Sequence, residues 1–121
     1  VPFIQIDDLN GALALMNLSQ ADYCFPVTEY PSGIQRALKL LHDSKMQPFF
    51  PEFELTRTQD LESAYYDAGQ FYWGKKEAWL KDLRIHSCGL GYAIPSWRVV
   101  DIDTPEDWYR AEILFNANFV Y

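Results

Sequence analysis

The chain has 121 residues, a net charge of −7, and contents of 49% hydrophobic and 17% aromatic residues. So apolar a composition excludes a disordered segment, and the length favours a single folded domain. The negative charge argues against a general binder of nucleic acid, because contact with a phosphate backbone needs a positive field.

No apolar run approaches the roughly 20 residues that cross a bilayer, and the first residues lack a signal-peptide pattern. We therefore expect a soluble, cytoplasmic protein with neither a membrane nor a nucleic-acid partner. Cys24 and Cys88 do not have the spacing of metal ligands, and we expect two buried thiols rather than a disulfide.

The first 30 residues predict a helix followed by a strand. Residues 6–18 place Leu9, Leu13 and Met16 on one helical face. Residues 22–28 alternate apolar and polar side chains, which is typical of a strand. Because proline has no backbone N–H, Pro26 predicts that this strand lies at a sheet edge or contains a bulge.

An aromatic, proline-rich excursion follows at about residues 30–59. Residues 30–33 predict a turn, and the pattern of residues 35–42 fits either a helix or a strand. Prolines within residues 46–55 predict short extended pieces in an irregular segment, and residues 59–65 predict a turn or a short helix. Exposed together, the aromatic residues of this excursion would form a patch of the kind that marks interfaces; they include Phe49, Phe50 and Phe53.

The rest of the chain alternates predicted strands and helices. We expect a strand at 69–73, a helix at 75–80 and extended segments at 84–88 and 92–94. A strand that ends in Asp101 and Asp103 and a helix from 105 to about 115 follow. This alternation predicts the α/β class.

The sequence of residues 99–108 is VVDIDTPEDW, an apolar strand that ends in two acids and turns into a helix. Side chains two residues apart share one face of a strand, so Asp101 and Asp103 are expected to lie together. Thr104 suits the N-cap and Pro105 the first helical position. Ligands of open α/β sheets bind at such strand ends, which favours a metal site. Helix capping and a solvated strand-end acid are the alternatives.

Two motifs, in this order, carry a family resemblance. Residues 66–74 are YDAGQFYWG, and residues 97–112 are WRVVDIDTPEDWYRAE. Together they resemble the carboxyl-terminal part of the acylneuraminate cytidylyltransferases, and within that family the pseudaminic acid cytidylyltransferases most closely. The resemblance runs from Val1 to about Phe115.

The resemblance implies roles for seven residues. Asp101 and Asp103 correspond to the catalytic acids that bind Mg²⁺. Arg57 corresponds to the arginine that pairs with the sugar carboxylate, a task that suits a planar guanidinium. The other residues expected to bind substrate are Arg36, Gln59, Gln70 and Tyr72. Solvated surface charges are the alternative for the arginines, and core packing is the alternative for the aromatic motif.

The implied fold is the carboxyl-terminal part of a Rossmann-like nucleotidyltransferase, with a mixed, mainly parallel sheet and flanking helices. Residues 1–121 would form the carboxyl-terminal portion of a single domain, with a dimerisation and sugar-site insertion at about 30–59 that projects across a homodimer.

The implied reaction transfers CMP from CTP to a nonulosonic acid, closest to pseudaminic acid, and releases pyrophosphate. No Gly- and Lys/Arg-rich triphosphate loop is present, so we expect this chain to be inactive alone. A non-catalytic dimerisation or sugar-binding module is the alternative function. The identity of the sugar stays open, because a few pocket contacts decide it.

Overall fold

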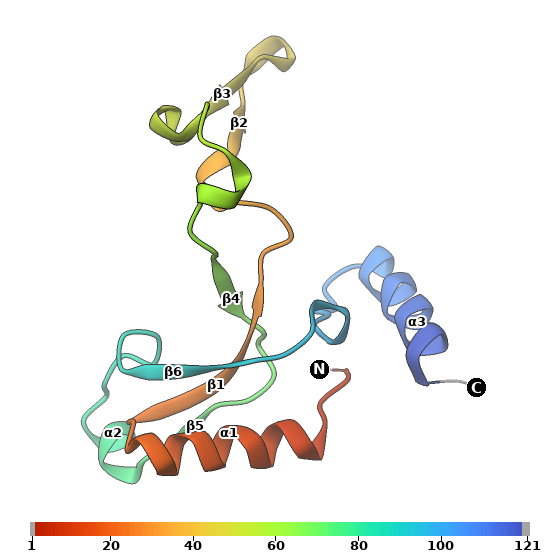
Figure 1. Cartoon of the computed structure of the whole chain (residues 1–121). Coiled ribbons are helices and arrows are strands. Elements are labelled where there is room, and N and C mark those ends of the chain that lie inside the picture. The colour runs from red at the N-terminus through yellow and green to blue at the C-terminus, as the bar shows by residue number, and fades with distance from the viewer. Residues whose placement is uncertain (1, 120–121) are drawn as a thin grey trace. The chain divides into compact units, whose positions relative to one another are not determined.

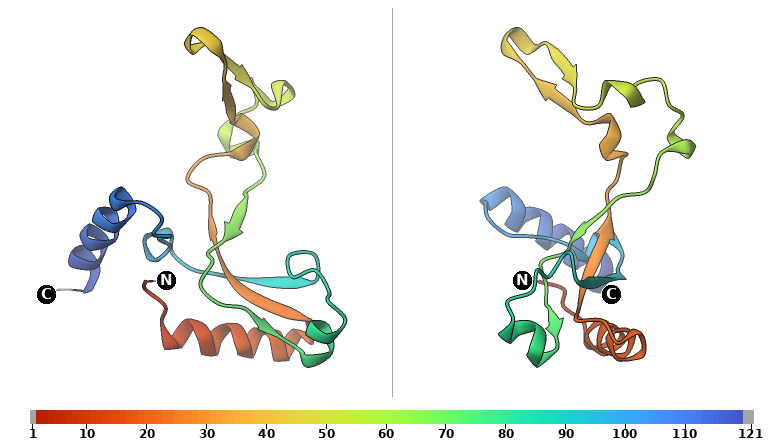
Figure 2. Two further views of the ribbon diagram at one scale, coloured as in Figure 1. Left: turned by 180° about the vertical axis from the view of Figure 1, so that it is seen from behind. Right: turned by 90° about the vertical axis from the view of Figure 1, so that its left-hand side faces the viewer.

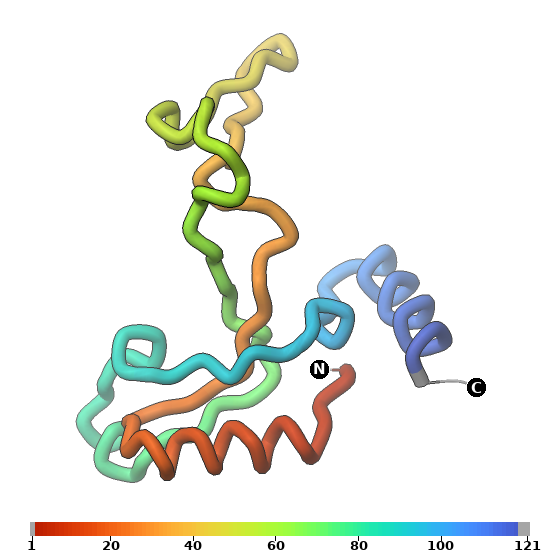
Figure 3. Tube along the Cα trace, viewed as in Figure 1, coloured from red at the N-terminus to blue at the C-terminus, as the bar shows by residue number. Residues whose placement is uncertain are grey.

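The computed structural model describes residues 2–119, and only the backbone of residue 119. Val1, where the predicted resemblance begins, lies outside the described residues. The chain divides into two compact units, which can be followed along the trace in Figure 1 and Figure 3. Unit 1 comprises Val1–Thr28 and Asp67–Tyr121, and unit 2 comprises Glu29–Tyr66.

Among the described residues, unit 1 contains three α-helices and the central strands of a small mixed sheet. Its α-helices are α1 (Ile6–Ser19), α2 (Lys76–Leu80) and α3 (Pro105–Phe119). Its strands are β1 (Tyr23–Glu29, whose last residue begins unit 2), β5 (Trp73–Gly74) and β6 (Gly89–Ala93), and a 3₁₀ turn spans Ser96–Arg98. The helices and the first strand predicted from the sequence are confirmed, with α3 extending to Phe119.

Strand β1 lies in the middle of the sheet. Tyr23 and Cys24 pair antiparallel with β5, and the same residues begin a parallel ladder with β6. The edge position predicted from Pro26 is therefore wrong. The Pro26 carbonyl accepts a hydrogen bond from the Ala68 N–H at 3.0 Å, at a point where the neighbouring chain leaves regular strand structure. The backbone side on which Pro26 lacks an N–H thus faces an irregular segment and not β6, so the ladder with β6 loses no hydrogen bond.

The core of unit 1 forms where α1 packs against the sheet (Figure 1, Figure 2). Ala12 and Met16 of α1 contact Cys24, and all three are buried. The indole N–H of Trp73 donates to the carbonyl of Leu9 at 2.9 Å, which ties β5 to the helix. A Cβ on Gly11 would lie 2.6 Å from the Tyr92 hydroxyl, so this glycine permits close packing of α1. Both cysteines are free thiols, as predicted, but only Cys24 is buried, and Cys88 is partly exposed.

Unit 2 is built around a short hairpin. Strands β2 (Leu38–Leu40) and β3 (Met46–Pro48) pair antiparallel, and 3₁₀ turns span Ile34–Arg36, His42–Ser44, Pro51–Phe53 and Thr58–Asp60. Strand β4 (Tyr65–Asp67) leads out of the unit. The short extended pieces predicted for residues 46–55 are confirmed, and residues 38–40 form a strand. A role of unit 2 in dimerisation stays a prediction.

Three strand predictions in unit 1 are wrong. Of residues 69–73, only Trp73 lies in a strand, because the Asp67 carboxylate accepts the Gly69 N–H and turns the chain at a glycine with φ of +70°. Residues 84–88 form a turn closed by a Cys88 N–H bond to the Arg84 carbonyl. Residues 99–101 are in no strand, because the preceding 3₁₀ turn takes up the Val99 N–H.

The fold class is accordingly mixed α/β. Only β1 and β6 are paired in parallel among the strands with a described register. A mainly parallel, Rossmann-like sheet stays a prediction. Within residues 2–119, none of the helices combines the length and apolar character needed to cross a membrane.

Candidate functional site

The two predicted metal acids lie in the segment between the 3₁₀ turn and α3. Both Asp101 and Asp103 are exposed. The negative charge of Asp101 is the main cause that raises the pKa of Asp103, and partial desolvation is a smaller one. The two carboxylates are therefore near enough to interact, although they do not share the face of a strand that the sequence predicts. A shared proton or a cation would relieve their repulsion.

Helix α3 begins with reciprocal capping that holds the chain beside Asp103. The Asp107 carboxylate accepts the N–H groups of Asp103 and Thr104, at 3.0 and 3.1 Å. The Thr104 hydroxyl accepts the Asp107 N–H at 3.2 Å, which confirms Thr104 as the N-cap. The bond from the Asp103 N–H is the main reason that the pKa of Asp107 lies below its ordinary value. The cap thus fixes the backbone on the carboxyl-terminal side of the acids.

Replacing Thr104 with alanine is expected to lower the free energy of unfolding by about 1 kcal/mol, because the Asp107 N–H loses its side-chain partner. Urea unfolding followed by circular dichroism measures this change. Thr58→Ala is the matched control, since Thr58 is exposed and starts a 3₁₀ turn in unit 2. An equal loss in both variants would contradict the capping role.

The acids fit a magnesium ion better than a structural metal. Within the described part of the chain, no three His, Cys, Asp or Glu side chains gather as a metal cage. Mg²⁺ commonly binds through one or two carboxylates and completes its shell with water and substrate phosphates. Two adjacent, exposed carboxylates match that donor set, with room for the remaining ligands.

Gln70 and Tyr72, predicted to share a face of a strand, lie in different environments because residues 70–72 are not a strand. Gln70 is 9% exposed, and its side-chain amide donates to the Arg98 carbonyl at 2.8 Å. Tyr72 is 42% exposed, and its hydroxyl donates to Asp67. Gln70 therefore connects this segment to the chain that precedes Asp101, while Tyr72 faces solvent.

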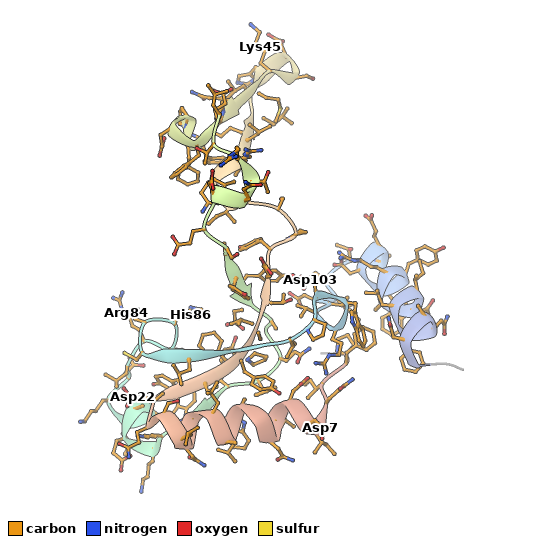
Figure 4. All side chains as sticks on the ribbon, viewed as in Figure 1. Asp7, Asp22, Lys45, Arg84, His86 and Asp103 are labelled. Atoms are coloured by element: carbon orange, nitrogen blue, oxygen red, sulfur yellow. The ribbon has the colours of Figure 1, made fainter. Side chains whose placement is uncertain are left out.

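A polar cluster around Asp67 was not predicted from the sequence. One oxygen of Asp67 accepts the Tyr72 hydroxyl at 2.7 Å and His86 Nε2 at 2.9 Å, and the other accepts the Gly69 N–H at 2.8 Å. The Phe25 ring packs against both Tyr72 and His86. His86 belongs to no recognisable motif, so the position of Asp67 inside the 66–74 motif is the signal in the sequence that could have pointed to this cluster. Figure 4 shows His86 and Asp103 toward different ends of β6, so this cluster is separate from Asp101 and Asp103.

Electrostatics within the cluster favour an ionised Asp67. Partial burial acts to raise the pKa of Asp67, but the hydrogen bonds from His86, Tyr72 and Gly69 outweigh it and hold that pKa below its ordinary value. The bond to Asp67 is also the main cause that raises the pKa of Tyr72 to about 12. An ionised carboxylate can only accept, so His86 Nε2 carries the proton that it shares.

Replacing Asp67 with asparagine is expected to destabilise the chain by about 2 kcal/mol at pH 7, because an amide cannot accept all three bonds. The folded-state pKa of Asp67 is depressed, so its contribution is complete above the unfolded value near 4 and disappears as the pH falls through the folded value. Urea unfolding should therefore show the two proteins diverging at neutral pH and converging in acid. Asp22→Asn, in the same unit, serves as the control, and a pH-independent difference for Asp67→Asn would contradict this account.

The remaining predicted substrate residues belong to unit 2 and are all exposed: Arg36, Arg57 and Gln59. Arg57 Nε lies 3.1 Å from an oxygen of Asp60, in an ion pair with both side chains mostly exposed. Such a surface pair contributes little to stability, so it can open when another anion arrives. Arg36 ends the Ile34–Arg36 turn, and Gln59 lies in the Thr58–Asp60 turn.

Comparison with known proteins supports the resemblance seen in the sequence. No family model matches the chain. Over nearly its whole length, however, the chain is homologous to cytidylyltransferases. The relatives are pseudaminic acid cytidylyltransferases from Campylobacter jejuni, 35% identical for serotype O:2 and 34% for serotype O:23/36 over 97% of this chain.

A third relative, from Helicobacter pylori, combines pseudaminic acid cytidylyltransferase with UDP-2,4-diacetamido-2,4,6-trideoxy-beta-L-altropyranose hydrolase. It is 35% identical over 67% of this chain, which corresponds to 15% of the longer relative. The chain spans about half the length of the two Campylobacter relatives, at 51%.

Proposed function

We propose that this chain forms part of a cytidylyltransferase that transfers CMP from CTP to pseudaminic acid. The observation that carries the proposal is the identity of 34–35% to two pseudaminic acid cytidylyltransferases over 97% of the chain. The pair of neighbouring carboxylates at Asp101 and Asp103 supports it, because nucleotidyl transfer needs a site for a divalent cation.

In the proposed reaction, the anomeric hydroxyl oxygen of the sugar bonds to the α-phosphorus of CTP, and the bond to the β-phosphate oxygen breaks to release pyrophosphate. The hydroxyl gives up its proton as the new bond forms. Asp101 and Asp103 would hold Mg²⁺, which neutralises phosphate charge when bound. Their exposure leaves room for phosphate and water ligands.

Arg57 is proposed to bind the sugar carboxylate, with Arg36 as a second cation and with Gln59 and Tyr72 as polar contacts. The exposed Asp60 that now pairs with Arg57 would be exchanged for the substrate carboxylate. For Gln70 the proposed role is indirect, since its amide already supports the Arg98 carbonyl.

We propose a homodimer through unit 2. Seven large apolar residues of the β2–β3 hairpin and the segment that follows it are exposed: Leu38, Leu40, Leu41, Met46, Phe49, Phe50 and Leu55. A soluble monomer rarely exposes so many apolar side chains over so short a segment. The same observation favours the second candidate function, a non-catalytic dimerisation or sugar-binding module.

The decisive experiment measures pyrophosphate release from CTP. The chain alone and a protein of the relatives' length that contains it are each supplied with Mg²⁺ and with pseudaminic acid or N-acetylneuraminic acid. The proposal expects release by the longer protein, fastest with pseudaminic acid, and none by the chain alone. If neither protein releases pyrophosphate with either sugar but the chain binds free sugar without metal or CTP, the binding module is the better account.

A further inference from the structure

The acids at 101 and 103 sit in a segment that the sheet does not hold. Residues 99–103 belong to no helix or strand. The carboxylates of Asp101 and Asp103 repel each other, and this repulsion acts to separate them. Something else must fix the backbone if the two side chains are to stay close enough to share a cation. Downstream, the Asp107 and Thr104 capping bonds do so.

The upstream anchor is Arg98, three residues before Asp101. Its guanidinium makes two bonds to the Asp8 carboxylate, at 2.7 and 3.2 Å, and a third to Gln5 at 2.6 Å. Its carbonyl accepts the Gln70 amide at 2.8 Å. Arg98 is therefore held through both its side chain and its backbone, by residues distant in sequence.

This anchor is buried, since Arg98 is 9% exposed and Asp8 is 4% exposed. A buried ion pair is a costly way to gain stability, because desolvation of both ions offsets much of their attraction. What a forked guanidinium pair provides better than apolar contact is a fixed direction and register. Val100, also buried, continues that fixed path to the acids.

We propose that Arg98, held by Asp8 and Gln70, is a positioning residue that sets the geometry of Asp101 and Asp103 for a divalent cation. This inference rests on the proposed function, because it assumes that the two acids bind metal. Arg98 does not touch the cation or the substrate, and it acts through the three residues that follow it.

The test uses Mn²⁺ as the probe and the isotopically labelled chain itself. Paramagnetic broadening of the amide signals near residues 101 and 103 reports the Mn²⁺ concentration at which the acids are half occupied. Arg98→Lys keeps the charge but loses the two-pronged contact, and we expect it to need about tenfold more Mn²⁺, as for other residues that orient metal ligands. Arg84→Lys, on an exposed loop, is the matched control and should leave the titration unchanged.

Two further variants separate positioning from stability. In the double variant Asp8→Glu with Arg98→Lys, the longer glutamate side chain can again contact the residue at position 98. This double variant should recover part of the Mn²⁺ affinity. Gly89→Ala crowds the Ile85 carbonyl at the start of β6, at the opposite end of that strand from the acids, and it should lower the melting temperature without changing Mn²⁺ affinity. An affinity that simply follows melting temperature in all variants would overturn the inference.

The outcomes also distinguish this inference from the proposed function. If the signals of residues 101 and 103 broaden at the same Mn²⁺ concentration in the unaltered chain and in Arg98→Lys, only the positioning role of Arg98 is overturned. No broadening at residues 101 and 103 in the unaltered chain, at millimolar Mn²⁺, overturns the proposed metal role and this inference with it.

Discussion

Asp103→Asn, made in a protein of the relatives' length, is expected to lower kcat/KM for pyrophosphate release by about 100- to 1,000-fold. The asparagine keeps the shape of the side chain but removes one of two neighbouring negative charges, so the site for the divalent cation is weakened. Pyrophosphate release at several Mg²⁺ concentrations measures the effect, and the loss should be greatest at low Mg²⁺.

Asp43→Asn is the matched control for this experiment. Asp43 is an exposed acid of unit 2 with φ of +62°, a conformation that asparagine tolerates well. It should retain full activity. Should Asp103→Asn also retain activity across the whole Mg²⁺ range, Asp103 would be only part of the α3 cap and not a metal acid.

Gly89→Ala should be among the most destabilising small substitutions in the chain, with an expected loss of about 3 kcal/mol in the free energy of unfolding. A Cβ at this position would lie 2.5 Å from the Ile85 carbonyl oxygen and 2.7 Å from Cε1 of the buried Phe25. The carbonyl belongs to the turn that feeds β6, so it cannot move without displacing the strand. Urea unfolding measures the loss.

Gly69→Ala provides the contrast, because a Cβ there meets no atom within 4 Å and only the positive φ is strained. Its expected cost is about 1 kcal/mol. A smaller loss for Gly89→Ala than for Gly69→Ala would show that the 84–88 turn yields easily and that β6 is not fixed by close packing.

Local signals predicted the helices well. The apolar spacing of residues 6–18 and the Thr-Pro-Glu-Asp start of α3 are each contained within a few residues, and the structure has both helices. The strands after residue 68 were harder to predict from the sequence, because a short apolar run is compatible with a buried loop as well as with a strand. Val100 illustrates this, since it is buried although no strand contains it.

The candidate site was predictable only where its parts are close in sequence. Asp101 and Asp103 are two residues apart, so their proximity followed from the motif. The Arg98 pair with Asp8 joins residues 90 positions apart, and the His86 bond to Asp67 joins residues 19 apart. No single-sequence pattern encodes such pairings, because they depend on how the sheet brings distant segments together.

The two ends of the excursion that contains the β2–β3 hairpin meet each other directly. The Tyr30 N–H donates to the Ala64 carbonyl at 2.9 Å, so the chain leaves and returns at neighbouring backbone positions. A tight turn of two residues could close that gap, at a smaller entropic cost than the present long loop. The excursion therefore begins and ends at one point of the chain, so its length can change without separating the two backbone positions that it connects.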